Sequence, residues 1–164
     1  MSFEFTKDEL ERLENLRTKV DDDRALVLPA LWVLQRRQGF INSEDILYLE
    51  KTLGIRAIYF AEVMGFYSMF NESPKGKYEL KFCKTITCKL RGSDEVVKAA
   101  QDLLGIKMGE TSADGLFSLG ESECLGYCEK APCMLCNLDQ IGDLTKESIT
   151  ELIDRLRSEN ASRK

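Results

Sequence analysis

The sequence predicts an α+β chain in which an N-terminal helical bundle precedes an α/β domain. Three observations lead to this expectation. Residues up to about 70 show helical periodicity with capping residues, the stretch NESPKGK at residues 71–77 is rich in turn formers, and the remainder alternates between strand and helix patterns. We therefore expect two domains, residues 1–74 and residues 75–164.

Four helices are expected in the first domain. Thr6 followed by Glu9 fits a capping box, and Asp23 and Ser43 are the expected caps of the second and third helices. The expected helices cover residues 7–20, 24–38, 44–53 and 56–64.

Glycine and proline mark where these helices should stop or bend. Gly39 and Gly54 are the expected stop signals of the second and third helices, and the fourth should end near Gly65. Pro29 lies inside the second helical pattern and predicts either a kink or a late start.

The second domain is expected to follow the order strand, helix, strand, strand, helix. YELKFC alternates in hydrophobicity like a half-buried strand, Ser93 precedes an amphipathic helix closed by Gly105, and Thr145 precedes a last amphipathic helix. The expected strands cover residues 78–83, 115–120 and 133–138.

Composition excludes several classes of protein. The net charge is −5, whereas general nucleic-acid binding needs a basic surface. The N-terminal segment is charged and has no small-residue cleavage site, so we expect no signal peptide. The longest uncharged apolar run, residues 25–34, is far shorter than the roughly 20 residues of a membrane span. We therefore expect a cytoplasmic protein that does not insert into a membrane.

The chain has six cysteines and no histidine. In a reducing compartment the cysteines are expected to be metal ligands or redox groups rather than structural disulfides. The lack of histidine excludes Ser–His and Cys–His catalysis, histidine-ligated zinc or haem, and a Rieske-type cluster. We therefore expect no catalytic residue of these kinds, and any metal site must be rich in thiolates or carboxylates.

Four of the cysteines form two pairs. Cys83 and Cys88 have four residues between them, and Cys124 and Cys128 have three. Cys83 should end a strand, Cys88 should lie in the loop after it, and the second pair should lie in a loop after another strand. Two such pairs at neighbouring strand ends can converge into a four-thiolate cage. Structural zinc favours tighter C-x2-C pairs, so the wider spacing favours a 2Fe–2S cluster while leaving zinc open.

The segments FCKTITCKLRGS (residues 82–93) and ECLGYCEKAP (123–132) resemble the thioredoxin-like 2Fe–2S ferredoxin subunit of NADH:quinone oxidoreductase, respiratory complex I. EVMGFYSMF (62–70) is similar to the aromatic segment before the ferredoxin domain of that family. The resemblance spans residues 10–157. It implies a thioredoxin-like second domain with Cys83, Cys88, Cys124 and Cys128 as the metal-binding ligands of one 2Fe–2S cluster.

The same resemblance implies a partner. In the family, a flavoprotein subunit carries FMN and the NADH site, and the cluster exchanges single electrons with that flavin. The sequence has no G-x-G-x-x-G between a strand and a helix, so this chain is expected to be an electron carrier without an NADH site of its own. Residues 1–74 are expected to dock the partner within a larger redox complex, whose peripheral arm would lie on the cytoplasmic face of the membrane.

An alternative stays within the same fold. Similar subunits occur in soluble NAD-linked hydrogenases, including electron-bifurcating ones, and in NAD-dependent formate dehydrogenases. The neighbouring subunits distinguish these complexes. Two further hypotheses have other chemistry: a zinc-stabilised adaptor, and a dithiol oxidoreductase that uses Cys133 and Cys136.

Cys133 and Cys136 depart from the apolar strand that the family has after the segment AP. Our interpretation is that both are small buried residues of a strand, pointing to opposite faces. The competing hypotheses are a C-x2-C dithiol, a surface disulfide, or alternative ligands that rescue or compete for the cluster.

Several other residues are expected around the cysteines and in the helical domain. Backbone N–H groups near Gly92 and Gly126 are expected to donate to the cluster sulfurs. The aromatic residues are interpreted as core, with any exposed part suited to a partner interface. The basic residues flanking the ligands, which would offset cluster charge or contact solvent and partner, are Lys84, Lys89, Arg91 and Lys130.

Overall fold

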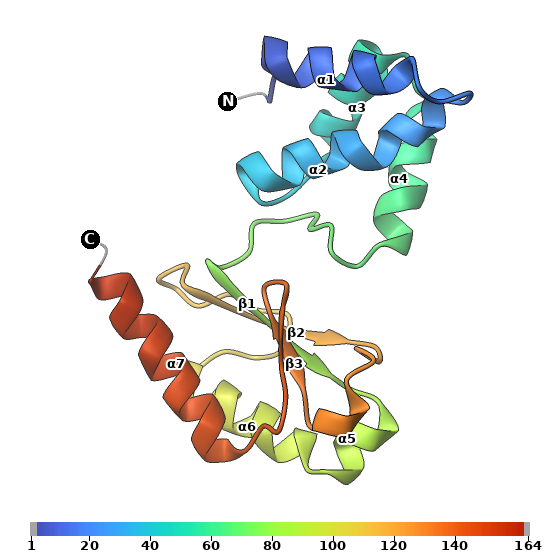
Figure 1. The fold of residues 1–164 in the computed structure, drawn as a ribbon. Coiled ribbons are helices and arrows are strands. Elements are labelled where there is room, and N and C mark those ends of the chain that lie inside the picture. The colour runs from blue at the N-terminus through green and yellow to red at the C-terminus, as the bar shows by residue number, and fades with distance from the viewer. Residues whose placement is uncertain (1–2, 163–164) are drawn as a thin grey trace. The chain divides into compact units, whose positions relative to one another are not determined.

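The computed structural model describes residues 3–162. Contacts divide the chain into two compact units, one ending at Pro74 and the other beginning at Lys75. The first unit is helical and the second combines a mixed four-stranded sheet with helices (Figure 1), which confirms the predicted α+β class.

The helical elements of the first unit follow the expected order. They are α1 (Lys7–Arg17), the 3-10 turn η1 (Asp23–Leu26), α2 (Val27–Gln38), α3 (Ser43–Leu53) and α4 (Ala57–Phe66). Their apolar faces meet in one core, whose completely buried members include Leu26, Ala30, Leu31, Leu34, Leu49 and Phe60.

The start of α1 is confirmed as a capping box. The Thr6 side chain accepts from the Glu9 N–H at 3.2 Å, and the Glu9 carboxylate accepts from the Thr6 N–H at 2.8 Å. The helix ends at Arg17, three residues before the predicted end, and Thr18 forms its C-terminal cap.

The second helix has the late start that proline predicts. A 3-10 turn precedes it, and the α-helix proper begins at Val27, so Pro29 lies in the first turn, where no intrahelical N–H is needed. The cap differs from the prediction, since Asp22 rather than Asp23 accepts from the Arg24 N–H at 2.9 Å. The predicted stop is confirmed at Gly39, which has φ 81°.

The observed cap of the third helix also differs from the predicted one by one residue. The Asn42 side chain accepts from the backbone N–H groups of Glu44 at 2.8 Å and Asp45 at 3.0 Å, while Ser43 is already the first helical residue. The prediction of Ser43 as the cap is therefore wrong, because the adjacent asparagine, an equally good N-cap, takes that role.

The second unit holds the remaining elements. They are β1 (Tyr78–Cys83), α5 (Ile86–Leu90), α6 (Ser93–Leu104), β2 (Phe117–Ser122), the 3-10 turn η2 (Cys128–Lys130), β3 (Met134–Cys136), β4 (Asp139–Ile141) and α7 (Lys146–Ala161). The three predicted strands and two predicted helices are present. The short helix α5 and the strand β4 were not predicted.

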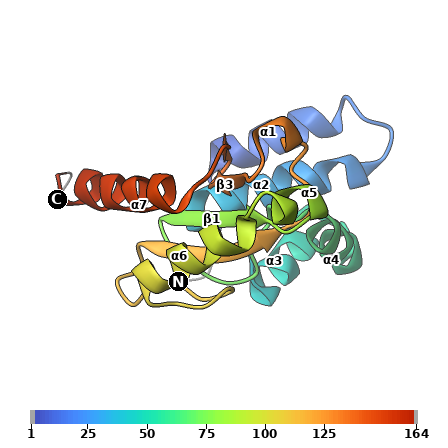
Figure 2. The same ribbon diagram turned by 90° about the horizontal axis from the view of Figure 1, so that it is seen from below.

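The strands lie in the order β2-β1-β3-β4. β1 is parallel to β2, with Cys83 opposite Ser122, and antiparallel to β3, with Phe82 opposite Met134. β4 pairs with β3 as a short hairpin. This topology places the carboxyl ends of β1 and β2 and the beginning of β3 at one edge of the sheet (Figures 1 and 2).

Helices α6 and α7 pack against each other and against one face of this sheet. Leu80 and Phe82 are two residues apart on β1 and both belong to that core, because every second side chain of a strand points to the same face of the sheet. Completely buried members of the core are Leu80, Ala100, Met134, Ile149 and Ile153.

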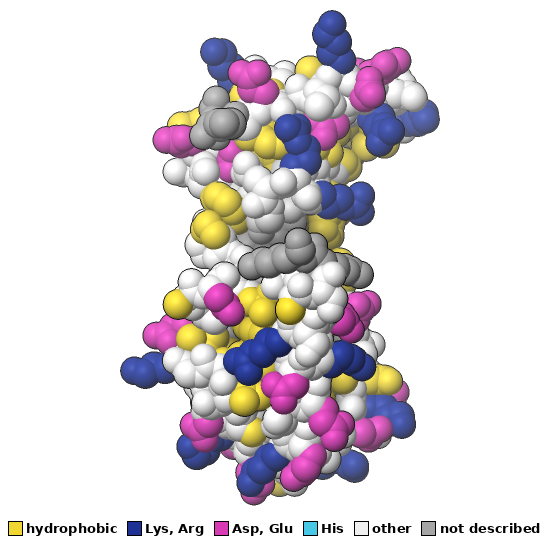
Figure 3. Space-filling view, turned by 90° about the vertical axis from the view of Figure 1, so that its left-hand side faces the viewer, with side chains coloured by type: hydrophobic (Ala, Val, Ile, Leu, Met, Phe, Trp, Pro, Cys, Tyr) yellow, Lys and Arg dark blue, Asp and Glu magenta, His cyan; other side chains and the backbone are white. Residues whose placement is uncertain are grey.

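The surface carries both signs of charge. On the face shown in Figure 3, Lys and Arg side chains are interspersed with Asp and Glu and do not gather into one basic patch. None of the helices among residues 3–162 combines the length and apolar character needed to cross a bilayer.

Candidate metal centre

The first cysteine pair lies where β1 leaves the sheet. Cys83 is the last residue of β1, and Cys88 lies in the middle of α5. Both side chains are buried, at 2% and 0% exposure. The expectation that Cys88 lies in a loop is therefore wrong, because the chain after Thr85 forms a helical turn that directs the Cys88 thiol inward.

The second pair lies in the loop after β2. Cys124 and Cys128 are exposed, and their Sγ atoms are 3.8 Å apart. The backbone N–H of Gly126 donates to the Cys124 sulfur at 3.5 Å, as predicted. The N–H of Gly92 itself donates to the Lys89 carbonyl at 3.0 Å.

The two pairs lie at the same edge of the sheet because β1 and β2 are parallel neighbours. Lys84 N–H donates to the Ser122 carbonyl at 3.0 Å, which continues the pairing up to the cysteine loops. The neighbouring Cys124 thiol makes the largest contribution to raising the pKa of Cys128. Burial and the charges of Cys88 and Cys83 raise it further. The pairs are thus within electrostatic range of each other.

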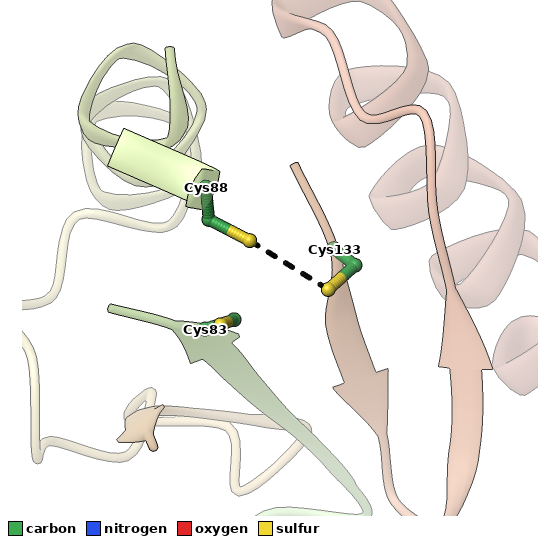
Figure 4. A group of neighbouring side chains, drawn as sticks. All are labelled: Cys83, Cys88 and Cys133. Atoms are coloured by element: carbon green, nitrogen blue, oxygen red, sulfur yellow. Dashed lines mark hydrogen bonds between the residues drawn. The ribbon is translucent and has the colours of Figure 1, made fainter. Parts of the chain in front are cut away.

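Cys133 adds a thiol to the buried pair. Its Sγ lies 3.7 Å from that of Cys88, and the sulfurs of Cys83, Cys88 and Cys133 all lie within 4.8 Å of one another (Figure 4). The Cys83 N–H donates to the Cys133 carbonyl at 3.1 Å. Figure 4 shows the three side chains converging from the end of β1, from α5 and from the residue that precedes β3.

Cys133 and Cys136 are both buried, as the sequence interpretation proposed. They also face different surroundings, since Cys133 joins the cysteine group and Cys136 packs in the main core with Met134 and Leu80. Burial raises the pKa of both thiols, that of Cys133 to about 12. Cys133 precedes β3 and Cys136 ends it, and because the two thiols lie in different clusters their arrangement does not favour the dithiol of an oxidoreductase.

The buried thiols differ in acidity. Burial raises the pKa of Cys83, but hydrogen bonds from the Thr85 side chain and from the backbone of Thr85 and Leu125 outweigh it and lower the pKa to about 7. Burial also raises the pKa of Cys88. Since Leu125 belongs to the second cysteine loop, its contact with Cys83 joins the two halves of the site.

The basic residues near the cysteines are largely paired. Lys84 lies 3.0 Å from a Glu123 oxygen, and Lys130 lies 2.9 Å from a carboxylate oxygen of Asp143. These ion pairs reduce the positive charge that the lysines could offer a cluster. Arg91 has a different role: its Nε donates to the Ala131 carbonyl at 2.7 Å, which ties α5 to the segment between Cys128 and Cys133.

The donor set fits a thiolate-bound metal centre. Two sulfurs bound to one tetrahedral ion at roughly 2.3 Å lie about 3.8 Å apart, which matches the separation of Cys124 and Cys128. Cys83 and Cys88 are buried and their sulfurs lie within 4.8 Å of each other, so they could supply two further ligands. Soft, thiolate-rich donors suit zinc and iron–sulfur clusters, and both remain compatible with this geometry.

Two named relatives match nearly the whole chain. An NADH-quinone oxidoreductase subunit of Rickettsia conorii is 37% identical over 161 residues, 96% of both chains. The mitochondrial NADH dehydrogenase [ubiquinone] flavoprotein 2 of Dictyostelium discoideum is 36% identical over 95% of this chain and 64% of its own.

The fold has a counterpart among solved structures. An NAD+-reducing [NiFe]-hydrogenase in its air-oxidised state superposes with a TM-score of 0.68 at 20% identity, over 79% of this chain and 23% of that one. The family described as "Thioredoxin-like [2Fe-2S] ferredoxin" matches residues 13–157. The chain therefore belongs to the thioredoxin-like 2Fe–2S ferredoxin family.

Proposed function

We propose that Cys83, Cys88, Cys124 and Cys128 hold one 2Fe–2S cluster, and that the chain is the electron-transfer subunit of an NADH:quinone oxidoreductase. The observation that supports the proposal is the placement of two cysteine pairs at the carboxyl ends of neighbouring parallel strands, Cys83 and Cys88 after β1 and Cys124 and Cys128 after β2. Membership of a 2Fe–2S family favours an iron–sulfur cluster over a zinc ion at such a site.

The chain's own groups prepare the site for thiolate ligands. The Thr85 hydroxyl lies 3.2 Å from the Cys83 sulfur, within hydrogen-bond distance, and the Gly126 N–H donates to the Cys124 sulfur at 3.5 Å. Such donors stabilise negative charge on ligand sulfurs and raise the reduction potential of a bound cluster. A 2Fe–2S cluster supplies a site that takes up and releases one electron at a time.

The flavin and nicotinamide are assigned to a partner subunit. The cavity beside Cys83 has a volume of about 150 Å³, below the roughly 300–1,000 Å³ typical of ligand pockets. The cysteines of the second pair are exposed, so an electron can reach their side of the site from a docked protein. The partner's FMN would pass single electrons to this chain.

The helical unit is proposed to dock that flavoprotein. Phe66 is the last residue of α4 and Tyr67 its C-terminal cap. They are 80% and 37% exposed, and their rings meet edge to face with centroids 5.0 Å apart. Ile58 on α4 and Leu47 on the adjacent α3 are exposed as well. Aromatic side chains are enriched at protein interfaces, so an exposed aromatic pair favours a permanent partner.

A pull-down with the co-expressed flavoprotein subunit tests this docking surface. Phe66→Ser should weaken binding roughly ten-fold or more, as for an interface hot spot, without changing the melting temperature. Leu138→Ser is the matched control, because Leu138 is 70% exposed but belongs to the second unit. Equal binding by the wild type and both variants would contradict the proposed surface.

Electron transfer is tested by EPR on the isolated chain and on its complex with the flavoprotein. NADH should reduce the cluster only when the flavoprotein is present, while dithionite should reduce it in both samples. Reduction of the isolated chain by NADH would contradict the assignment of the NADH site to the partner.

The relatives favour one of the two candidate complexes for this subunit. Full-length similarity to proteins named as subunits of NADH-quinone oxidoreductase favours a quinone complex, whose peripheral arm would lie on the cytoplasmic face of a membrane. The likeness to the NAD+-reducing hydrogenase concerns the fold. Co-purification decides: membrane subunits support the quinone complex, whereas a hydrogen-activating or formate-oxidising subunit supports the alternative.

A further inference from the structure

The chain brings five thiols to a site that needs four. Cys133 stands beside Cys83 and Cys88 but has no place among the proposed ligands, and sequence reasoning interpreted it mainly as a packing residue. Its thiol is 2% exposed and faces the buried pair rather than the main core.

We propose that Cys133 is a reserve ligand, able to replace Cys83 beside Cys88 when the Cys83 thiolate is lost. The inference rests on the proposed function, because it concerns the same cluster. Replacing one thiolate by another keeps four thiolates around the cluster and leaves its charge unchanged. The Cys133 proton passes to water as the sulfur binds iron, and no electron is transferred.

The sulfur positions support this exchange. Two thiolates sharing one tetrahedral metal at roughly 2.3 Å lie about 3.8 Å apart, and the Cys88 and Cys133 sulfurs already lie 3.7 Å apart. Cys83 and Cys133 also lie within 4.8 Å of each other. The Cys133 sulfur therefore lies close enough to Cys88 for the two thiolates to share a metal ion.

The backbone holds Cys133 in this position. Its carbonyl accepts from the Cys83 N–H, and the next residue, Met134, is opposite Phe82 in the antiparallel ladder. Arg91 bonds to Ala131, two residues before Cys133. These backbone contacts do not involve the Cys83 side chain, so we expect Cys133 to keep its position when that side chain is shortened.

The exposed pair has no comparable reserve. Of the two cysteines outside the proposed ligand set, Cys133 joins the buried group and Cys136 packs in the main core among Leu80 and Met134. The proposal therefore predicts an asymmetry: the site tolerates loss of Cys83 but not loss of Cys124.

Iron and acid-labile sulfide contents of full-length variants, purified and reconstituted without oxygen, test the proposal together with EPR after dithionite reduction. Cys83→Ala should keep the iron and sulfide of the wild type and show altered g values, because one ligand has changed. Cys83→Ala/Cys133→Ala should lose the cluster. Cys83→Ala/Cys136→Ala, the matched control, should keep it, and so should Cys133→Ala alone.

Any other result contradicts either the reserve role of Cys133 or the proposed function. Loss of the cluster from Cys83→Ala while the wild type keeps it would overturn the reserve role and leave the proposed function standing. Loss from Cys133→Ala alone would make Cys133 a resident ligand and also overturn the proposal. A wild-type chain without iron would defeat the proposed function itself. If the double alanine variant does not fold by circular dichroism, Cys83→Ala/Cys133→Val fills the same space with an apolar side chain.

Discussion

The sulfurs of Cys88 and Cys133 lie 3.7 Å apart although 45 positions separate the two residues in the chain. The contact arises because β3 returns antiparallel beside β1 and brings its first residues to the end of the strand that carries Cys83. Thiols from three segments, namely β1, α5 and the residue before β3, therefore lie at one edge of the sheet. The exposed pair follows β2, the parallel neighbour of β1, and so lies at the same edge.

The cap of α3 gives a first prediction. Asn42→Ala should lower the free energy of unfolding by about 1 kcal/mol, because two backbone N–H groups lose their acceptor. Ser43→Ala is the matched control and should be nearly neutral, since Ser43 lies inside the helix. Trp32, the single tryptophan, lies in the helical unit, so its fluorescence in urea reports this change. A larger effect from Ser43→Ala would contradict the observed cap.

Close packing at Gly76 gives a second prediction. A Cβ atom there would come within 2.6 Å of the backbone carbon of Phe117, so Gly76→Ala should cost about 1–3 kcal/mol of stability. Gly120→Ala is the control, because its Cβ would meet only the flexible Lys81 side chain, at 3.3 Å. Thermal unfolding followed by circular dichroism should show the larger fall in melting temperature for Gly76→Ala. Equal falls would contradict this interpretation of the contact.

The ion pair at the start of η1 gives a prediction about pH. The hydrogen bond from the Arg24 side chain lowers the pKa of Asp22. The folded state therefore gains stability above the ordinary carboxyl pKa of about 3.9 and loses it as the pH falls through the lowered value. Asp22→Asn keeps an acceptor for the Arg24 N–H but removes the charge.

The melting temperature of Asp22→Asn, followed by Trp32 fluorescence, should lie below that of the wild type at pH 7 and approach it below about pH 4. Salt should reduce the difference at pH 7, because the pair is exposed and screened. A difference that is constant from pH 7 to pH 3 would show that the carboxylate charge contributes nothing.

Much of the fold could be predicted from local patterns. The capping box at Thr6, the stop at Gly39 and the strand that ends at Cys83 are all confirmed, because each depends on residues close together in the sequence. The errors at Asp22 and Asn42 are shifts of one residue between two side chains with similar capping ability. The three-residue strand β4 is too short to show a period.

The site could be predicted only in part. The spacing of the cysteines identified the two pairs, and the family pattern identified them as candidate ligands. The helical turn around Cys88 and the approach of Cys133 could not be read from spacing, since both depend on how β3 pairs with β1. The unusual cysteine after the segment AP was the one signal that pointed to Cys133.

Analysis of iron, sulfide and zinc, combined with EPR before and after dithionite, tests the central claim most directly. The chain purified without oxygen should contain two irons and two sulfides, as the [2Fe–2S] composition requires, with a spin-half signal on reduction. Cys124→Ala should lose that signal. A colourless protein that holds zinc and gives no reducible centre even after reconstitution would contradict the account.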